Sequence, residues 1–363
     1  MRINFVLPIA DMSGGNKVVT IYAKLLSNLG HEVLLVSPPP KKPSIIYKLK
    51  SFLKRQGWPK NKIPKSFLYN SELNYKILDR YRPVTDKDLP DGDVVIATWW
   101  ETAEWVNKLN KSKGAKVYFI QHHEVFNYLP VKRSSSTYRL PLHKIVIARW
   151  LVDIMKYTYF DTSVDLVPNG VDINQFFAAA RNKQYIPTIG FLFSHAEFKG
   201  VDISLKVIKK VKEILPNLRI LSFGSSLPIE YPHWIKEIEF YHSPEQNKIR
   251  EIYAQCDVWL TASKSEGFNL PVMEAMACRT PIVSTKTGWP IESITDGYNG
   301  YLVNIDDVDA MVSSVLLILT SSNQEWLNFS NNAFNTIENS TWENSVKLLE
   351  QALSRAVEAN TLI

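Results

Sequence analysis

Cysteine is scarce in this sequence: only Cys256 and Cys278 occur among 363 residues. No C-x-x-C pair exists, so a disulfide framework and a cysteine-based metal site are excluded, and we expect a reducing compartment. No apolar run reaches 18 residues, which argues against a membrane-spanning helix. No G-x-G-x-x-G follows the first apolar segment and G-K-[ST] is absent, which disfavours a dehydrogenase and a P-loop NTPase.

What remains is an ordinary globular composition. Hydrophobic residues make up 45% and charged residues 21%, which excludes disorder, collagen and coiled coil. At roughly 150 residues per domain, the length predicts two domains or one large one. The opening MRINFVLPIA reads better as a buried strand than as a leader segment. We therefore expect a cytoplasmic protein.

Charge is divided unevenly along the chain. Up to Ala180 there are 26 Lys and Arg against 15 Asp and Glu, and afterwards 16 against 21. A basic half favours a polyanionic neighbour: nucleic acid, an anionic membrane or a phosphorylated substrate. Nucleic acid has no supporting motif, so we expect none.

Much of the excess lies between Lys41 and Lys65, where nine basic residues occur without one acidic residue. Apolar residues recur between them at near-helical spacing: Ile45, Ile46, Leu49, Phe52 and Leu53. Such a segment could bind an anionic surface at the inner face of the cell membrane. A solvated helix–loop insertion explains the pattern equally well, so both interpretations stay open.

Two arrays of alternating strands and helices predict an α/β fold. INFVLPIA, the loop DMSGGN, the helix pattern KVVTIYAKLLSNLG and HEVLLVS form a βαβ unit with parallel strands. The alternation starts again at PTIGFLF, after residues 169–187, which are interpreted as a linker. Two parallel-sheet halves predict ligands in a cleft at the carboxyl ends of the strands.

The most informative stretch runs from Ser263 to Val303. Glu266 follows an apolar strand, and Glu274 is predicted in the first turn of the next helix. Backbone N–H groups between them, at the helix N-terminus, could bind a diphosphate. Carboxylates beside a diphosphate repel it, so the two glutamates are expected to bind hydroxyls of a ribose or a sugar.

The full pattern S-x-x-E-G-F-x-L-P-x-x-E-A-M-A-C-x-T-P-I-V resembles the donor site of retaining GT-B glycosyltransferases of the family 4 type (glycosyl transferases group 1). Four more segments carry the likeness: GG with Leu26–Val33, Val167–Asp172, Phe198–Asp202 and Thr341–Trp342. The resemblance implies Rossmann-like domains at 1–172 and 173–340, facing each other across a cleft. It also implies that a C-terminal helix, 341–363, crosses back onto the first domain.

The resemblance also implies residue roles. Lys199 would contact the donor diphosphate, Glu266 the donor sugar and Glu274 the ribose. His122 would be the active-site histidine at a strand end, with adjacent His123 as the alternative. Catalytic roles thus fall on His122, Lys199 and Glu266. Donor binding falls on Gly15, Lys199, Glu266, Gly267, Phe268, Asn269, Leu270 and Glu274.

Several residues depart from the family pattern. Phe191 is interpreted as standing where the family has a phosphate-binding arginine, with His195 or Arg219 as candidate substitutes. Gly288-Trp289-Pro290 replaces a glycine pair, and glycine is usual at Asn269 and Arg279. We expect these departures to alter the donor sugar pocket.

The function implied is retaining transfer of a hexose from a nucleotide diphosphate sugar, UDP-glucose first, to a saccharide or lipid-linked saccharide in glycan or polysaccharide biosynthesis. No cofactor and no essential metal are expected. Two alternatives stay open. A non-hydrolysing nucleotide-sugar epimerase would consume the donor without an acceptor, and a nonenzymatic binding module would release no nucleoside diphosphate.

Overall fold

The computed structural model describes the chain except residues 42–51, 53–64, 228–236 and 362–363. The predicted membrane-binding segment therefore lies almost entirely outside the described residues. The chain forms two compact units. Unit 1 comprises Met1–Ile147, Leu151–Val167 and Val346–Ile363, and unit 2 comprises Ala148–Trp150 and Pro168–Ser345.

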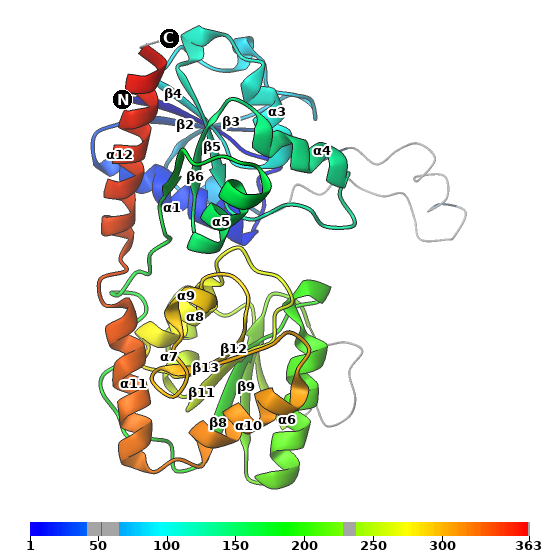
Figure 1. Cartoon of the computed structure of the whole chain (residues 1–363), viewed down its shortest axis with the longest axis vertical. Coiled ribbons are helices and arrows are strands. Elements are labelled where there is room, and N and C mark those ends of the chain that lie inside the picture. Colours follow the sequence, from blue (N-terminus) through cyan, green and yellow to red (C-terminus); the bar gives the residue numbers. More distant parts are fainter. Residues whose placement is uncertain (42–51, 53–64, 228–236, 362–363) are drawn as a thin grey trace. The chain divides into compact units, whose positions relative to one another are not determined.

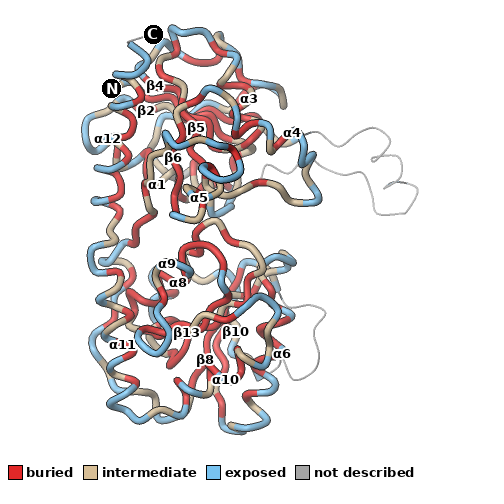
Figure 2. The backbone as a smooth tube through the Cα atoms, in the orientation of Figure 1, coloured by how far each residue is buried: buried red, intermediate tan, exposed pale blue. Residues whose placement is uncertain are grey.

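Unit 1 contains a seven-stranded parallel sheet in the order β3-β2-β1-β4-β5-β6-β7. Its strands are β1 Arg2–Val6, β2 Glu32–Ser37, β3 Asn74–Ile77, β4 Val94–Ala97, β5 Ala115–Ile120, β6 His143–Val146 and β7 Val164–Leu166. β1 and β4 are buried throughout, apart from Arg2 (Figure 2). Apart from Arg2 and the buried Asn4, their residues are apolar, as expected for parallel strands covered on both faces.

Helices connect these strands by parallel crossovers. Among the described residues, the helices of unit 1 are α1 Gly14–Asn28, α3 Trp100–Asn107, α4 Val131–Ser136, and most of α5 Arg149–Thr158 and α12 Trp342–Thr361 (Figure 1). Short 3-10 helices cover Phe67–Asn70, Asp86–Asp88, Lys111–Lys113 and Thr137–Arg139. The crossover from β1 through α1 leads to β2, and the crossover from β4 through α3 leads to β5, in the opposite direction along the sheet. Because both crossovers are right-handed, α1 and α3 cover opposite faces of the sheet.

Unit 2 contains a six-stranded parallel sheet in the order β10-β9-β8-β11-β12-β13. Its strands are β8 Thr188–Leu192, β9 Arg219–Gly224, β10 Ile238–His242, β11 Val258–Thr261, β12 Ile282–Thr285 and β13 Gly300–Val303. Its helices are α6 Val201–Ile214, α7 Gln246–Ala254, α8 Leu270–Ala277, α9 Pro290–Ser293, α10 Val308–Leu319 and α11 Asn323–Ile337, with a 3-10 turn at Glu197–Lys199. The prediction of two parallel Rossmann-like halves is confirmed.

Both sheets reverse their strand order at the centre. In unit 1 the reversal lies between β1 and β4, and in unit 2 between β8 and β11. At such a point the connections leave in opposite directions and open a crevice at the carboxyl ends of the strands, where ligands bind. Lys199 follows β8 and Glu266 follows β11, so both belong to the reversal of unit 2.

The final helix and the segment predicted as a linker both belong to compact units. α12 is tied to unit 1 by His31 Nε2 to Glu350 Oε1 at 2.8 Å and Arg355 Nη2 to Asp165 Oδ1 at 2.7 Å. The expected return of the C-terminal helix to the first half is confirmed. Residues 169–187, interpreted as the linker between the halves, follow the junction and lie within unit 2, where Val171 pairs with Thr341.

Candidate functional site

Two distant loops of unit 2 meet at the turn that carries Lys199. The Lys264 N–H donates to the Phe198 carbonyl at 2.7 Å, which joins the loop after β8 to the loop after β11. Gly200 permits this approach, because its φ is +59° and a Cβ there would stand 1.9 Å from the Ala262 carbonyl oxygen. Only glycine adopts this conformation in so little space. The turn Phe198-Lys199-Gly200 therefore packs closely against the residues that follow β11.

Lys199 and Glu266 form an ion pair. Lys199 Nζ lies 2.7 Å from Glu266 Oε1, and the Ser263 hydroxyl donates to the same oxygen at 2.7 Å. The Glu266 side chain is 8% exposed and that of Lys199 22%. The two residues that the sequence assigned to a diphosphate and to a sugar are therefore adjacent at one pocket, which Thr261, Asn269 and Pro271 also line.

The N-terminus of α8 opens beside this pair. Asn269 precedes the helix with φ +80° and ψ +59°, and its amide donates to Thr261 Oγ1 at 3.3 Å. Asparagine tolerates this left-handed conformation, so the departure from the usual glycine preserves the turn. The first N–H groups of a helix have no intrahelical acceptor, and the loop from Gly267 to Leu270 presents them in a position suited to an anion.

Glu274 lies farther along α8 than predicted. It is the fifth residue of the helix, in the second turn, and it does not line the pocket around Lys199. The Tyr253 hydroxyl, from α7, donates to Glu274 Oε2 at 2.9 Å. Burial, followed by the nearby Glu274 carboxylate, raises the pKa of Tyr253 well above its ordinary value. Tyr253 therefore remains a hydrogen-bond donor and holds one carboxylate oxygen in place.

The Gly288-Trp289-Pro290 departure does lie beside the site. The Trp289 N–H donates to the Phe268 carbonyl at 2.8 Å, and the two rings stack at 5.4 Å. A Cβ on Gly288 would lie 2.9 Å from the Glu266 Cβ, and Gly288 has φ +62°. The indole thus braces the loop that carries Glu266 and Phe268.

Three other residues named in these departures, Phe191, Arg219 and Arg279, do not line the pocket around Lys199. Phe191 is 1% exposed and packs in the core, while its neighbour Leu192 lines the pocket, so an arginine at 191 would point away from Lys199. Arg219 begins β9, so it stands at the amino ends of the strands, whereas the pocket lies at their carboxyl ends. Its guanidinium donates to both carboxylate oxygens of Glu239 at 2.7 Å. Arg279 follows the carboxyl end of α8, also remote from the pocket. Of the substitutes considered, only His195 shares the Lys199 loop, and its ring contacts the Leu227 carbonyl.

In unit 1, the glycine loop contacts the end of β5. Ser13 caps α1, and the Gln121 amide donates to the Gly15 carbonyl at 3.3 Å. A Cβ on Gly15 would stand 3.4 Å from that amide nitrogen, which is ordinary van der Waals contact. Gly15 and the strand end carrying His122 are therefore neighbours at the carboxyl edge of this sheet.

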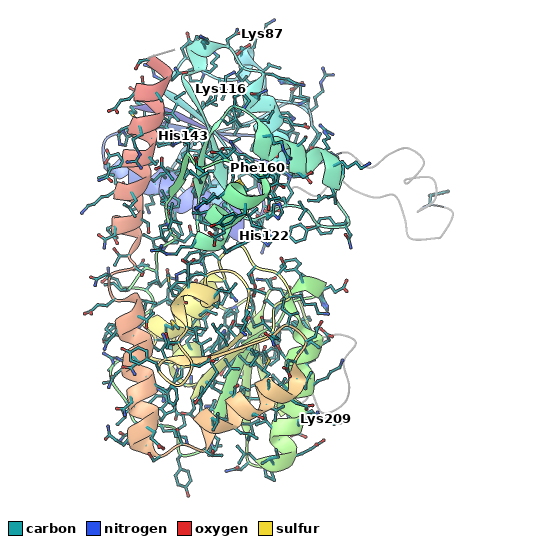
Figure 3. All side chains as sticks on the ribbon, viewed as in Figure 1. Lys87, Lys116, His122, His143, Phe160 and Lys209 are labelled. Carbon is teal, nitrogen blue, oxygen red and sulfur yellow. The ribbon has the colours of Figure 1, made fainter. Side chains whose placement is uncertain are left out.

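The two adjacent histidines have different surroundings. His123 Nε2 lies 2.8 Å from the Tyr159 hydroxyl, and its ring also packs on Tyr138. Burial, and then the charge of His122, lower the pKa of His123. His122 instead packs on Phe126, past the end of β5 and at the opposite edge of the sheet from His143 (Figure 3). The enclosure of His123 favours His122 as the functional histidine, which stays a prediction.

A buried carboxyl holds the turn after β5. Glu124 is 2% exposed and accepts the Trp100 N–H at 3.0 Å. The Tyr138 hydroxyl accepts the Glu124 N–H at 2.7 Å and donates to the His122 carbonyl at 3.1 Å. Burial raises the pKa of Glu124 well above its ordinary value. Tyr138 therefore fixes the backbone on both sides of His123.

Several of these residues were missed from sequence. Ser263 could have been found, because it stands three residues before Glu266 in the S-x-x-E pattern. Tyr253, Gln121 and Tyr138 have no local signal, since each reaches its partner across the fold. Within the described residues, no cluster of three His, Cys, Asp or Glu side chains suits a metal ion, and no helix is long and apolar enough to span a membrane.

Comparison with solved structures defines the architecture. The chain is similar to the Anabaena protein HepE in complex with UDP, with a TM-score of 0.74 and 15% identity over 98% of this chain and 100% of that one. Sucrose-phosphate synthase from Thermosynechococcus elongatus gives a TM-score of 0.73 at 15% identity, over 99% and 100%. The two parallel-sheet units thus have the GT-B fold.

Sequence comparison points to the same class for the second half. Residues 172–336 match the family model of glycosyl transferases group 1. Among curated relatives, the D-inositol 3-phosphate glycosyltransferase of Stackebrandtia nassauensis is 27% identical over 184 residues, 44% of this chain. This alignment covers 41% of the relative's length. The family match includes Lys199, Glu266 and Glu274.

Proposed function

We propose that this chain is a retaining hexosyltransferase, which moves a hexose from a nucleotide diphosphate sugar to a hydroxyl of a saccharide or lipid-linked saccharide. The observation that carries the proposal is the 2.7 Å contact between Lys199 and Glu266 beside the N-terminus of α8. That arrangement combines a cation and backbone N–H groups, which suit a diphosphate, with a carboxylate, which suits hydroxyls.

Each residue then has one task. The α8 N-terminus and Lys199 bind the diphosphate, and Lys199 offsets the charge that builds on it as it leaves. Glu266 binds hydroxyls of the donor sugar, and Glu274, held by Tyr253, binds the ribose. The bond from the anomeric carbon to the phosphate oxygen breaks, the bond to the acceptor oxygen forms on the same face, and the leaving phosphate oxygen takes the acceptor proton.

UDP-glucose is the donor proposed first. The HepE structures similar in fold were determined with UDP and with UDP-glucose, which supports a uridine nucleotide here. The reaction is proposed to need no essential metal. A chelator should then leave the rate of UDP release unchanged, and a rate restored only by a divalent ion would contradict this part.

The acceptor is proposed to bind unit 1 near His122, and the Gly15 loop keeps its proposed contact with the donor phosphates. This assignment is supported by the placement of both at the carboxyl edge of the sheet, next to the reversal between β1 and β4. Docking on an anionic membrane through residues 41–65 is retained as a proposal that liposome sedimentation can test.

A UDP binding experiment on wild type and Glu274→Ala tests the donor site. A ligand present at 100 times its Kd stabilises the folded form by about 2.7 kcal/mol, so UDP should raise the melting temperature of the wild type. The variant should bind UDP at least roughly tenfold more weakly, because a charged acceptor of ribose hydrogen bonds is lost. Equal UDP affinity in the two proteins would exclude the ribose role.

A coupled assay separates the proposed activity from its alternatives. UDP release from UDP-glucose that rises with added saccharide supports a transferase. Conversion of the donor without an acceptor would indicate an epimerase, and tight UDP binding with no turnover on any saccharide would indicate a binding module.

A further inference from the structure

We infer that Tyr128 is a stacking platform for a sugar ring of the acceptor. The inference rests on the proposed function and adds the residue and the chemistry by which unit 1 would recognise a saccharide. The observation behind it is a run of aromatic rings that starts at His122 and ends at an open face.

The rings follow one another along the loop between β5 and α4. The centroids of His122 and Phe126 are 4.8 Å apart, and those of Phe126 and Tyr128 are 5.3 Å apart with only 7° between the planes. Tyr128 is 71% exposed. One face of its ring therefore rests on Phe126 while the phenol remains open to solvent.

A single exposed aromatic side chain is ordinary on a protein surface, but Tyr128 differs in that its ring is stacked on Phe126. The φ angle of Tyr128 is not positive, so its backbone is not in the strained left-handed region. Phe126 holds the ring parallel to itself, so the orientation is set before any ligand binds. A preoriented aromatic ring loses little side-chain entropy on binding.

A saccharide ring is the occupant that fits this surface. The face of an aromatic ring carries negative charge density, and the C–H groups on one face of a pyranose carry partial positive charge. Stacking leaves the hydroxyls at the rim of the sugar able to bond polar groups nearby. The run begins at His122, the side chain proposed to act at the acceptor, so a sugar on Tyr128 would adjoin that site.

The test compares the binding of simple glycosides to variants of the whole chain. The probes are methyl glucoside, methyl galactoside and methyl N-acetylglucosaminide at millimolar concentration, with open-chain sorbitol as the polyol that lacks a ring face. Saturation-transfer NMR reports binding. Tyr128→Ala should weaken glycoside binding roughly three- to tenfold, while Tyr128→Phe should retain it, because the ring face and not the hydroxyl makes the contact.

Tyr157→Ala is the matched control. Tyr157 is 66% exposed near the end of α5, at the amino edge of the same sheet, and its loss should not change glycoside binding. Equal binding by Tyr128→Ala and wild type, equal binding of sorbitol and the glycosides, or no glycoside binding by the wild type would each overturn the platform. UDP binding by the wild type is measured separately. If that is absent, the proposed function fails, whatever the glycosides do.

Discussion

Lys199 and Glu266 form an ion pair, although their proposed tasks differ: Lys199 is proposed to bind the diphosphate and Glu266 the donor sugar. The pair is mostly buried, with Glu266 also accepting from Ser263. A buried carboxylate needs such partners, because an unpaired one is strongly disfavoured. If the proposed diphosphate binds Lys199, we expect sugar hydroxyls to take its place at Glu266. We therefore expect a ligand that carries both a diphosphate and a sugar to bind better than a bare phosphate.

Removing the lysine tests this. Lys199→Ala should lower kcat by roughly 10²–10³, the range seen when one preorganised donor is removed. The KM for the donor should change less, because the α8 N-terminus still binds the diphosphate. Steady-state kinetics measures both constants. Lys209→Ala, on the exposed side of α6 (Figure 3), is the control and should match the wild type. A kcat for Lys199→Ala within threefold of wild type would assign the charge to another residue, with His195 the next to test.

A change of one oxygen atom tests the positioning of Glu274. Tyr253→Phe keeps the buried ring and removes the hydroxyl that bonds Glu274 at 2.9 Å. UDP affinity should fall roughly three- to tenfold, the effect of one hydrogen bond, and the affinity for 2′-deoxy-UDP should fall less. Isothermal titration measures both. Tyr298→Phe, at an exposed position of the same unit, should change neither. An equal loss for the two nucleotides would mean that Tyr253 acts on packing and not on the ribose.

At the scale of elements, the turn after β5 depends on a buried acid. Glu124 links this turn to the start of α3 through the Trp100 N–H, and Tyr138 links it to the 3-10 turn at Thr137–Arg139. Three separate elements thus meet behind His122. Because burial raises the pKa of Glu124, the protonated form is favoured in the folded state.

The raised pKa of Glu124 determines how the free energy of unfolding changes with pH. A carboxyl whose folded pKa is raised contributes full stability below its unfolded pKa of about 4.3 and loses it as the pH rises through the folded value. Glu124→Gln keeps an acceptor for Trp100 and does not ionise. The variant should therefore gain free energy of unfolding over the wild type as the pH rises from about 4.5 to 8. Urea unfolding at several pH values measures this difference, and a difference that shrinks with rising pH would contradict it.

At the scale of the whole molecule, α12 belongs to unit 1 although it follows unit 2 in sequence. In the part of the helix assigned to unit 1, five apolar side chains are 0–3% exposed: Val346, Leu349, Ala352, Leu353 and Ala356. The charged contacts of Glu350 and Arg355 add to this packing, but partly exposed pairs contribute little. Burial of the apolar face therefore carries most of the attachment.

Leu353→Ala measures that attachment. Deleting a fully buried leucine side chain should cost unit 1 roughly 2–4 kcal/mol of stability. Leu348→Ala is the control, because Leu348 is 42% exposed on the same helix and a surface change usually costs less than about 0.5 kcal/mol. Calorimetry with and without UDP identifies the two units, since UDP should shift the transition of unit 2. A loss confined to the UDP-sensitive transition would show that α12 stabilises the other unit.

The sequence by itself determined the alternation of strands and helices and the placement of Lys199 and Glu266 at strand ends. These are local properties. Apolar runs without alternation specify buried parallel strands, and the glycine at 200 and the asparagine at 269 specify left-handed turns that only a few residues adopt. Glu266 and Glu274 lie within one strand–loop–helix segment, so their spacing can be recognised in the sequence alone.

The tertiary structure decided which side chains meet. Lys199 and Glu266 are 67 residues apart, and only the adjacency of β8 and β11 in the sheet brings them within 2.7 Å. Strand alternation turned Phe191 into the core and Leu192 toward the site, although a one-residue shift in register would have exchanged them. Arg219 stands at the amino end of β9, whereas Lys199 follows the carboxyl end of the neighbouring β8. The packing of α7 on α8 brings Tyr253 to Glu274. Contacts of this kind depend on chain crossings that no local pattern encodes.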